Sequence, residues 1–146
     1  MAEDREIVKK WRKDRWLRVG VTAAVVLLVG ILLVTGRVWT IISEYSFKIK
    51  STYWPSKEVL FEEIWSLEFR EEFDTGKRVG GFGSWALSMG NFRNEEFGNY
   101  TLYGNNCCKA YVVVETADGM VVVNEKDREK TLKLYEKIKE RWENTH

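Results

Sequence analysis

The chain has 146 residues, of which 45% are hydrophobic and 31% are charged, and its formal net charge is +1. This length fits one ordinary domain with a short additional segment, and the apolar content excludes a largely disordered chain. Residues 1–18 hold seven basic and four acidic side chains, a net charge of +3, and the remaining 16 basic and 18 acidic side chains give −2. A domain with this charge lacks the basic surface of nucleic-acid-binding proteins, so we do not expect nucleic acid as a partner.

The first long feature of the chain is an uncharged segment, residues 19–36. A helix rises ~1.5 Å per residue, so this segment would cover roughly 27 Å, close to the hydrocarbon thickness of a bilayer. Its two ends carry charged and indole side chains, which are typical of the membrane–water interface. These membrane-flanking residues are Trp16, Arg18, Arg37 and Trp39. The pattern predicts one transmembrane helix over residues 19–39.

Two other interpretations of this segment compete with a membrane anchor. A buried core helix is disfavoured, because so small a domain could not enclose it on every face. A cleaved signal peptide fits the basic start and the small residues at 34–36, but the apolar region of a signal peptide is usually only ~7–15 residues long. We therefore favour a retained anchor.

The charge distribution predicts how the chain is oriented in the cell membrane. Because the basic residues gather before the apolar segment, the N-terminus is expected in the cytoplasm and the globular part on the extracytoplasmic side. The expected organisation is a basic cytoplasmic segment (1–18), a single transmembrane helix (19–39) and one globular domain (41–146).

The globular part begins with strand patterns. Apolar and polar side chains alternate over residues 45–50 and again over residues 64–69, which is the period of a β-strand. In the second of these segments, the alternation places Trp65, Leu67 and Phe69 on one face.

Further strands are predicted in the second half of the domain. The glycines and aromatic residues of 80–92 indicate one or two short strands with bends, and residues 100–103 form another. Residues 110–116 and 120–124 are dense in β-branched side chains, and the Asp-Gly pair between them is typical of a hairpin. Antiparallel pairing is therefore expected there.

The last part of the chain changes to a helical period. Residues 127–143 are expected to form an amphipathic helix with Asp127 as its N-cap. The apolar face expected to pack on the sheet consists of Leu132, Tyr135, Ile138 and Trp142. Several antiparallel strands followed by one helix define an α+β fold.

Five segments together resemble a known family. They are EEIWSLEF (62–69), GKRVGGFG (76–83), GNFRNEEFGNYTLY (90–103), VVVETADGMVVVN (112–124) and DREKTLKLYEKIKE (127–140). In these segments the chain resembles the bacterial pleckstrin-homology-like (PH-like) domains found behind transmembrane segments. The resemblance implies a PH-like two-sheet antiparallel β-barrel or sandwich of about seven strands, closed at one end by a C-terminal helix. It brings no catalytic residues.

The sequence offers little for catalysis. The only histidine is His146, which leaves no partner for a Ser–His or Cys–His pair and no usual zinc ligand set. Cys107 and Cys108 are adjacent, which is not the spacing of a CxxC motif. The glycines of 80–90 match neither GxxxxGK[ST] nor GxGxxG. We therefore expect a protein without enzymatic activity, metal or cofactor.

Aromatic residues crowd residues 82–103, and a few of them could rim an exposed patch beside basic side chains. The candidate interaction patch consists of Lys77, Arg78, Phe82, Trp85, Phe92 and Arg93. The predicted function is a membrane-anchored, non-catalytic binding or assembly module, whose expected partners are the bilayer and a protein partner or a second copy. Two alternatives stay open: a lipid-headgroup-binding domain that uses Lys77, Arg78 and Arg93, and a scaffold subunit that self-assembles through its sheet edges.

Overall fold

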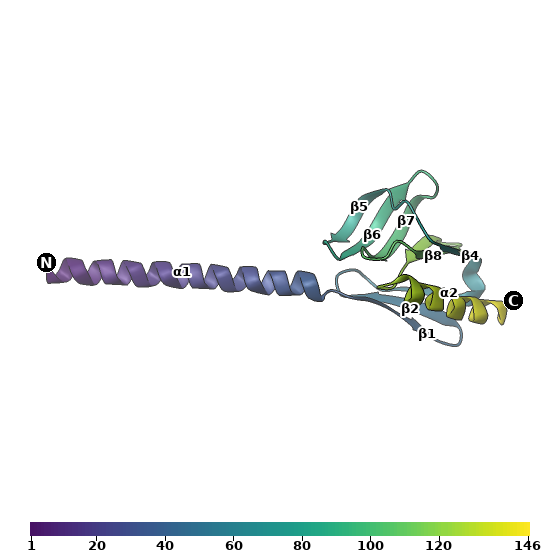
Figure 1. Cartoon of the computed structure of the whole chain (residues 1–146), viewed down its shortest axis with the longest axis horizontal. Helices are drawn as coiled ribbons and strands as arrows, with labels where there is room; N and C mark the ends of the chain where they lie inside the picture. Colours follow the sequence, from purple (N-terminus) through teal and green to yellow (C-terminus); the bar gives the residue numbers. More distant parts are fainter. The chain divides into compact units, whose positions relative to one another are not determined.

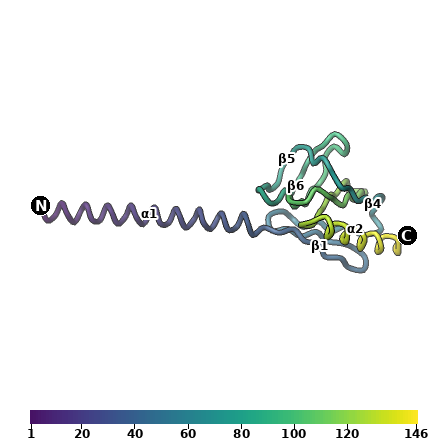
Figure 2. Tube along the Cα trace, in the orientation of Figure 1, coloured from purple at the N-terminus to yellow at the C-terminus, as the bar shows by residue number.

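The computed structural model describes all residues from 1 to 146 and divides into two units, residues 1–35 and residues 36–146. The first unit is a helix, and the second is a β-rich domain that ends in a second helix (Figure 1). The trace of the chain in Figure 2 shows the strands of the second unit arranged as two layers. Each unit is described by itself below.

The first unit is the single helix α1 (Ala2–Thr35), none of whose residues is buried. Its second half is apolar on all sides, a composition shared by membrane-spanning helices and signal sequences and different from that of a helix with one face on a protein core. The helix ends four residues before the expected boundary at 39. Arg37 follows the helix, and Trp39 lies in the first strand of the domain.

The second unit begins with a three-stranded antiparallel sheet, sheet A. Its strand order is β1-β2-β3, and the register places Trp39 opposite Lys50 and Ile41 opposite Lys48. The strands are β1 (Val38–Ile42), β2 (Ser46–Ser51) and β3 (Lys57–Leu60), followed by a short 3₁₀ turn, η1 (Phe61–Glu63). The sequence pattern predicted β2, whereas β1 and β3 were missed.

The remaining strands form a six-stranded sheet, sheet B, with the order β4-β8-β9-β7-β6-β5. All neighbouring strands are antiparallel except β7 and β9, which run parallel. The strands are β4 (Ile64–Arg70), β5 (Lys77–Gly83), β6 (Leu87–Asn94), β7 (Gly98–Asn105), β8 (Tyr111–Thr116) and β9 (Gly119–Val123). The hairpin expected at Asp118-Gly119 is confirmed, since Thr116 pairs with Gly119.

Helix α2 (Arg128–Glu143) closes the domain. Its N-cap is Asp127, as predicted, and the Oδ1 atom of Asp127 accepts a hydrogen bond of 2.8 Å from the Lys130 amide. The buried residues of α2 are Thr131, Leu134 and Ile138. The buried face of α2 is therefore rotated slightly from the predicted one. Of the four predicted residues, Ile138 lies at the centre of the buried face, and Leu132, Tyr135 and Trp142 lie at its margins.

Sheet B carries apolar side chains on both of its faces. One face packs against sheet A and α2 in the inter-sheet core, where Phe47 and Val59 of sheet A meet Met89 and Val112 of sheet B. The opposite face carries a second cluster, which we call the outer aromatic cluster. It consists of Phe92, Tyr100, Leu102, Tyr111, Val113 and Val122, with Phe73, Phe97 and Met120 packed against it. The two sheets and the C-terminal helix therefore form a sandwich, as expected.

One expected side-chain direction is wrong. A β-bulge interrupts the pairing of β4 with β8 between Ile64 and Ser66. The extra residue shifts the alternation, so Ile64 and Leu67 are buried while Trp65 is 66% exposed. Trp65 therefore does not share the buried face of Leu67.

A pair of buried amides joins the ends of β7 and β9. The Asn105 amide N–H donates to Oδ1 of Asn124 at 2.6 Å, and the Asn124 side chain donates to the carbonyl oxygens of Asn105 and Cys108 at 3.2 and 3.0 Å. Both side chains are almost completely buried. The Asn124 side chain therefore satisfies three buried backbone groups, and these groups lose their hydrogen-bond partner when the side chain is removed.

We expect Asn124→Ala to lower the free energy of unfolding by about 3 kcal/mol, because three buried hydrogen bonds of ~1 kcal/mol each are lost and their partners remain buried. Unfolding of the full chain in detergent, followed by near-ultraviolet circular dichroism, measures this loss. Asn91→Ala, at an exposed strand position, is the matched control and should change stability by less than about 0.5 kcal/mol. Equal effects of the two substitutions would contradict the role of the amide pair.

Candidate binding cleft

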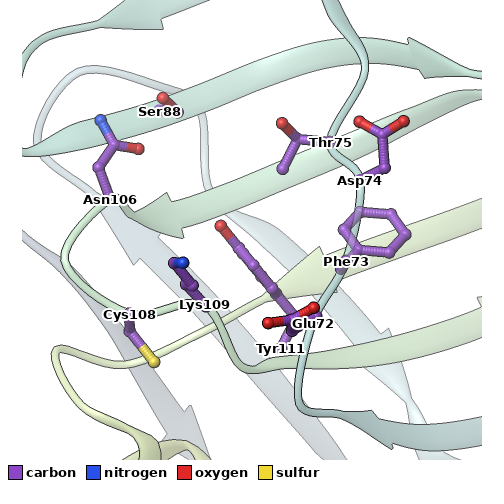
Figure 3. Close-up of a pocket in the computed structure, with 9 residues that line it drawn as sticks. All are labelled: Glu72, Phe73, Asp74, Thr75, Ser88, Asn106, Cys108, Lys109 and Tyr111. Atoms are coloured by element: carbon purple, nitrogen blue, oxygen red, sulfur yellow. The ribbon is translucent and has the colours of Figure 1, made fainter.

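A cleft of about 510 Å³ opens next to the outer aromatic cluster. Three separate segments form it: the loop after β4, strand β6, and the segment from the end of β7 to the start of β8 (Figure 3). The residues that line it are Glu72, Phe73, Asp74, Thr75, Ser88, Asn106, Cys108, Lys109 and Tyr111. We call it the Tyr111 cleft.

The loop between β4 and β5 forms one wall of the Tyr111 cleft, and hydrogen bonds hold it in place. Oδ1 of Asp74 accepts from the Gly76 amide at 2.9 Å, and Gly76 has a φ of 67°, which favours glycine. The Tyr100 hydroxyl donates to the Thr75 carbonyl at 2.6 Å. The Phe73 ring packs on Phe97, with ring centroids 5.5 Å apart. This wall is therefore formed before any ligand arrives.

The segment after β7 forms the opposite wall and is held equally well. The Asn106 amide N–H donates to the Ala86 carbonyl at 2.9 Å, and the Asn106 side chain donates to the Ser84 carbonyl at 3.0 Å. The Cys108 carbonyl accepts the hydrogen bond from the buried Asn124 side chain. Because both walls are fixed by the fold, the cleft has a defined shape, as ligand sites usually do.

Tyr111, the first residue of β8, lies at the base of the cleft. Only 7% of the residue is exposed, and its ring contacts Phe73 edge-on with centroids 5.7 Å apart. Its hydroxyl group has no hydrogen-bond partner within the protein and points into the cleft, between the wall of Asp74 and Thr75 and the wall of Asn106 (Figure 3). The hydroxyl oxygen is open to the cleft, so it can form a hydrogen bond with water or with a bound group.

The electrostatics of the cleft favour hydrogen bonding over ionisation of Tyr111. Burial raises the pKa of the Tyr111 hydroxyl, and the nearby Cys108 and Cys107 thiols raise it further. The hydroxyl therefore keeps its proton at neutral pH and is able to donate a hydrogen bond. Glu72 and Asp74 supply negative charge to the lining, and Lys109 supplies positive charge. This mixture suits a polar ligand that carries both donors and acceptors.

The two cysteines differ in their surroundings. Cys107 is exposed, and its thiol lies 3.1 Å from the Lys126 carbonyl. Cys108 is buried, with its sulfur 3.6 Å from the Thr131 hydroxyl of α2. No group of three or more His, Cys, Asp or Glu side chains is placed to hold a metal ion anywhere in the described chain.

The structure does not gather the six residues of the candidate interaction patch into one surface. The β5–β6 register places Lys77 opposite Arg93 and, on the other face of the sheet, Arg78 opposite Phe92. Phe92 is 5% exposed and belongs to the outer aromatic cluster, so it is unavailable to a partner.

The other two aromatic members of the candidate patch also differ from each other. Phe82 is half-buried, because its ring packs on Tyr53 with centroids 4.4 Å apart. Trp85, in the β5–β6 turn, is 75% exposed. Lys77 and Arg93, facing each other without an ion-pair partner, are the part of the patch that stays together at the surface.

The four membrane-flanking residues lie in different elements. Trp16 and Arg18 are exposed residues of α1, whereas Arg37 and Trp39 belong to the second unit. Helix α1 is long and apolar enough to cross a membrane, a property that it shares with signal sequences. It is the one such helix in the chain.

Two antiparallel-dominated sheets closed by a C-terminal helix define a PH-like domain, a class whose members generally serve as binding or assembly modules. Residues 39–139 match the family described as "Bacterial PH domain", and the chain belongs to this family. No curated protein and no solved structure matches the chain.

Sequence reasoning missed the Tyr111 cleft. Its lining comes from three segments that are far apart in the chain, and Tyr111 begins a strand whose other residues fill the core. The one local signal was the polar run Gly104-Asn105-Asn106, whose composition is typical of a turn. Gly104 and Asn105 instead end β7, and the turn begins at Asn106.

We expect Tyr111→Phe to change the free energy of unfolding by less than about 0.5 kcal/mol, because the hydroxyl that it removes has no partner in the protein. Tyr100→Phe is the matched comparison, and it should cost about 1 kcal/mol because it removes the hydrogen bond to Thr75. Thermal unfolding of the full chain in detergent compares the two. A larger loss for Tyr111→Phe than for Tyr100→Phe would show that the Tyr111 hydroxyl is satisfied internally.

Proposed function

We propose that this chain is a single-pass membrane protein whose PH-like domain is a non-catalytic binding module, with the Tyr111 cleft as its ligand site. The observation that carries the proposal is the Tyr111 hydroxyl, which has no hydrogen-bond partner within the protein and opens into a preformed cleft. The lining also contains no histidine that could act as a general base beside a nucleophile. A binding role fits these side chains better than a catalytic one.

Helix α1 is the proposed membrane anchor. Its apolar half is exposed on every side in the structure, so retention in a bilayer would remove that surface from water. The basic residues before it support a cytoplasmic N-terminus and an extracytoplasmic domain. A signal sequence would share the apolar helix but would be cut from the mature protein.

We expect Cys107 to report this orientation, because its side chain is exposed and Cys108 is buried. A membrane-impermeant maleimide added to intact cells should label the chain, and Cys107→Ser should abolish that labelling. Labelling only after the cells are permeabilised would place the domain in the cytoplasm. A mature chain that lacks helix α1 by mass, and that alkaline carbonate extracts from membranes, would show a cleaved signal sequence.

A second candidate function is self-assembly, and the exposed edge of sheet B favours it. Strand β5 pairs only with β6, so its other edge has free backbone groups. Val79 on this strand is 67% exposed, and Trp85 follows it in the turn. Lys77 and Arg93, the like-charged pair on the same margin, would suit an acidic partner surface or a lipid headgroup instead.

A photo-crosslinking amino acid at Lys109, an exposed residue in the lining of the Tyr111 cleft, tests the ligand site in cells. We expect an adduct that Tyr111→Phe weakens severalfold, because the hydroxyl donates to the ligand. The same amino acid at Glu136, an exposed position of α2, is the control. Equal adducts at both positions, or no effect of Tyr111→Phe, would count against the cleft, and an adduct with the mass of two chains would favour self-assembly.

A further inference from the structure

A second cleft, of about 450 Å³, lies at the start of the domain. It is formed by the first residues of β1, the segment after β9 and the first turn of α2. Its lining consists of Arg37, Val38, Trp39, Glu125, Lys126 and Lys130. We call it the basic cleft, because three of these six side chains are cationic.

The cations of the basic cleft are largely free of acidic partners. The side-chain nitrogens of Arg37 and Lys126 have no carboxylate oxygen within 4.0 Å. Lys130 pairs with Asp127 at 3.1 Å, in an exposed ion pair of the kind that contributes little. Cations that are brought together from separate elements and outnumber the nearby carboxylates attract an anion to the space between them.

One acidic side chain, that of Glu125, belongs to the lining of the basic cleft. Glu125 is half-buried, and burial raises the pKa of its carboxyl group. Its backbone is fixed, because its amide N–H donates to the Thr131 hydroxyl at 3.1 Å. Even with Glu125 ionised, Arg37, Lys126 and Lys130 leave these six lining residues with a net charge of +2.

Chain connectivity decides where an anion for this cleft would come from. Arg37 is the second residue after Thr35, the last residue of α1, and two Cα–Cα steps of ~3.8 Å keep the two residues within about 8 Å of each other. If α1 crosses a bilayer, its end lies at the interface, where lipid phosphates are the abundant anions. Trp39 in the lining is 42% exposed, and indole rings favour this layer.

Strand β1 and its neighbour β2 also present apolar and basic side chains next to each other. Ile41 is 46% exposed, and the neighbouring strand presents Lys48 and Lys50 opposite Ile41 and Trp39. Exposed apolar side chains interleaved with lysines are typical of protein surfaces that lie on anionic membranes. The basic cleft is thus one end of a surface with this composition.

We propose that the basic cleft binds the phosphate group of an anionic phospholipid in the leaflet where α1 ends. Arg37 and Lys126 would contact the phosphate oxygens directly, Lys130 would add charge, and Trp39 would lie against the upper part of the acyl chains. This inference rests on the membrane anchoring proposed above. It concerns a different site from the Tyr111 cleft.

Lysine reactivity in lipid nanodiscs tests the proposal with the full chain. The chain is reconstituted in discs of phosphatidylcholine alone, or of phosphatidylcholine mixed with phosphatidylglycerol, and acetylation of each lysine is followed by mass spectrometry. Lys126 and Lys130 should react about fivefold more slowly in the anionic discs, the change expected for a basic residue close to an anionic surface. Lys137, an exposed residue farther along α2, should change less than twofold.

Matched double variants distinguish specific lipid binding in the basic cleft from the general attraction of basic residues to an anionic surface. Lys126→Gln/Lys130→Gln should lose the enrichment of phosphatidylglycerol among lipids that stay bound in neutral detergent. Lys133→Gln/Lys137→Gln removes the same charge from α2 and should keep it. Circular dichroism confirms that both variants are folded. Equal lysine reactivity in the two discs, or equal loss of enrichment in both variants, would overturn the proposal.

Two further outcomes have separate meanings. Inorganic phosphate added to phosphatidylcholine discs should protect Lys126 and Lys130 little, and full protection by it would assign the cleft to free phosphate and overturn the lipid proposal. A chain that does not float with the discs would refute the anchoring, and the lipid proposal would fall with it. A chain that floats without protection of Lys126 and Lys130 refutes the lipid proposal alone.

Discussion

The domain depends on one constraint: sheet B is apolar on both faces, so both faces must be covered. Sheet A and α2 cover the first face, and the Tyr103 hydroxyl fixes this side to the β2–β3 loop by donating to the Pro55 carbonyl at 2.6 Å. No second sheet covers the other face. The loop after β4 does so, with Phe73 packed on Phe97, Tyr100 and Tyr111.

This arrangement explains why the Tyr111 cleft exists. A loop covers a sheet less completely than another sheet does, so a space remains between its edge and the segment that leads into β8. The aromatic residues that the sequence concentrates in this region serve mainly to complete that cover. Most of them are core, and the Tyr111 hydroxyl is a polar group left open at the edge of the cover.

Patterns that depend on neighbouring residues were predicted well, and those that depend on distant ones were not. The hairpin at Asp118-Gly119 and the helix capped by Asp127 are local, and both are confirmed. Strand β1 was missed because Trp39 fits a membrane flank as well as a strand. Trp65 was placed on the wrong face because a bulge depends on the partner strand, which the period of one segment does not reveal. Neither cleft was predicted, since each joins segments separated by tens of residues.

The single parallel pairing, between β7 and β9, also determines how this sheet can be assembled. It consists of three residue pairs, Thr101 with Val121, Leu102 with Val122 and Tyr103 with Val123. On one side of this seam lies the meander β5-β6-β7, and on the other the hairpin β8-β9, each built from strands adjacent in the chain. Local pairings of this kind form quickly, whereas the seam and the pairing of β4 with β8 must wait for distant parts of the chain to meet. The sheet therefore consists of two halves with local connections, and the seam between them, with the buried Asn105–Asn124 pair at its end, holds these halves together.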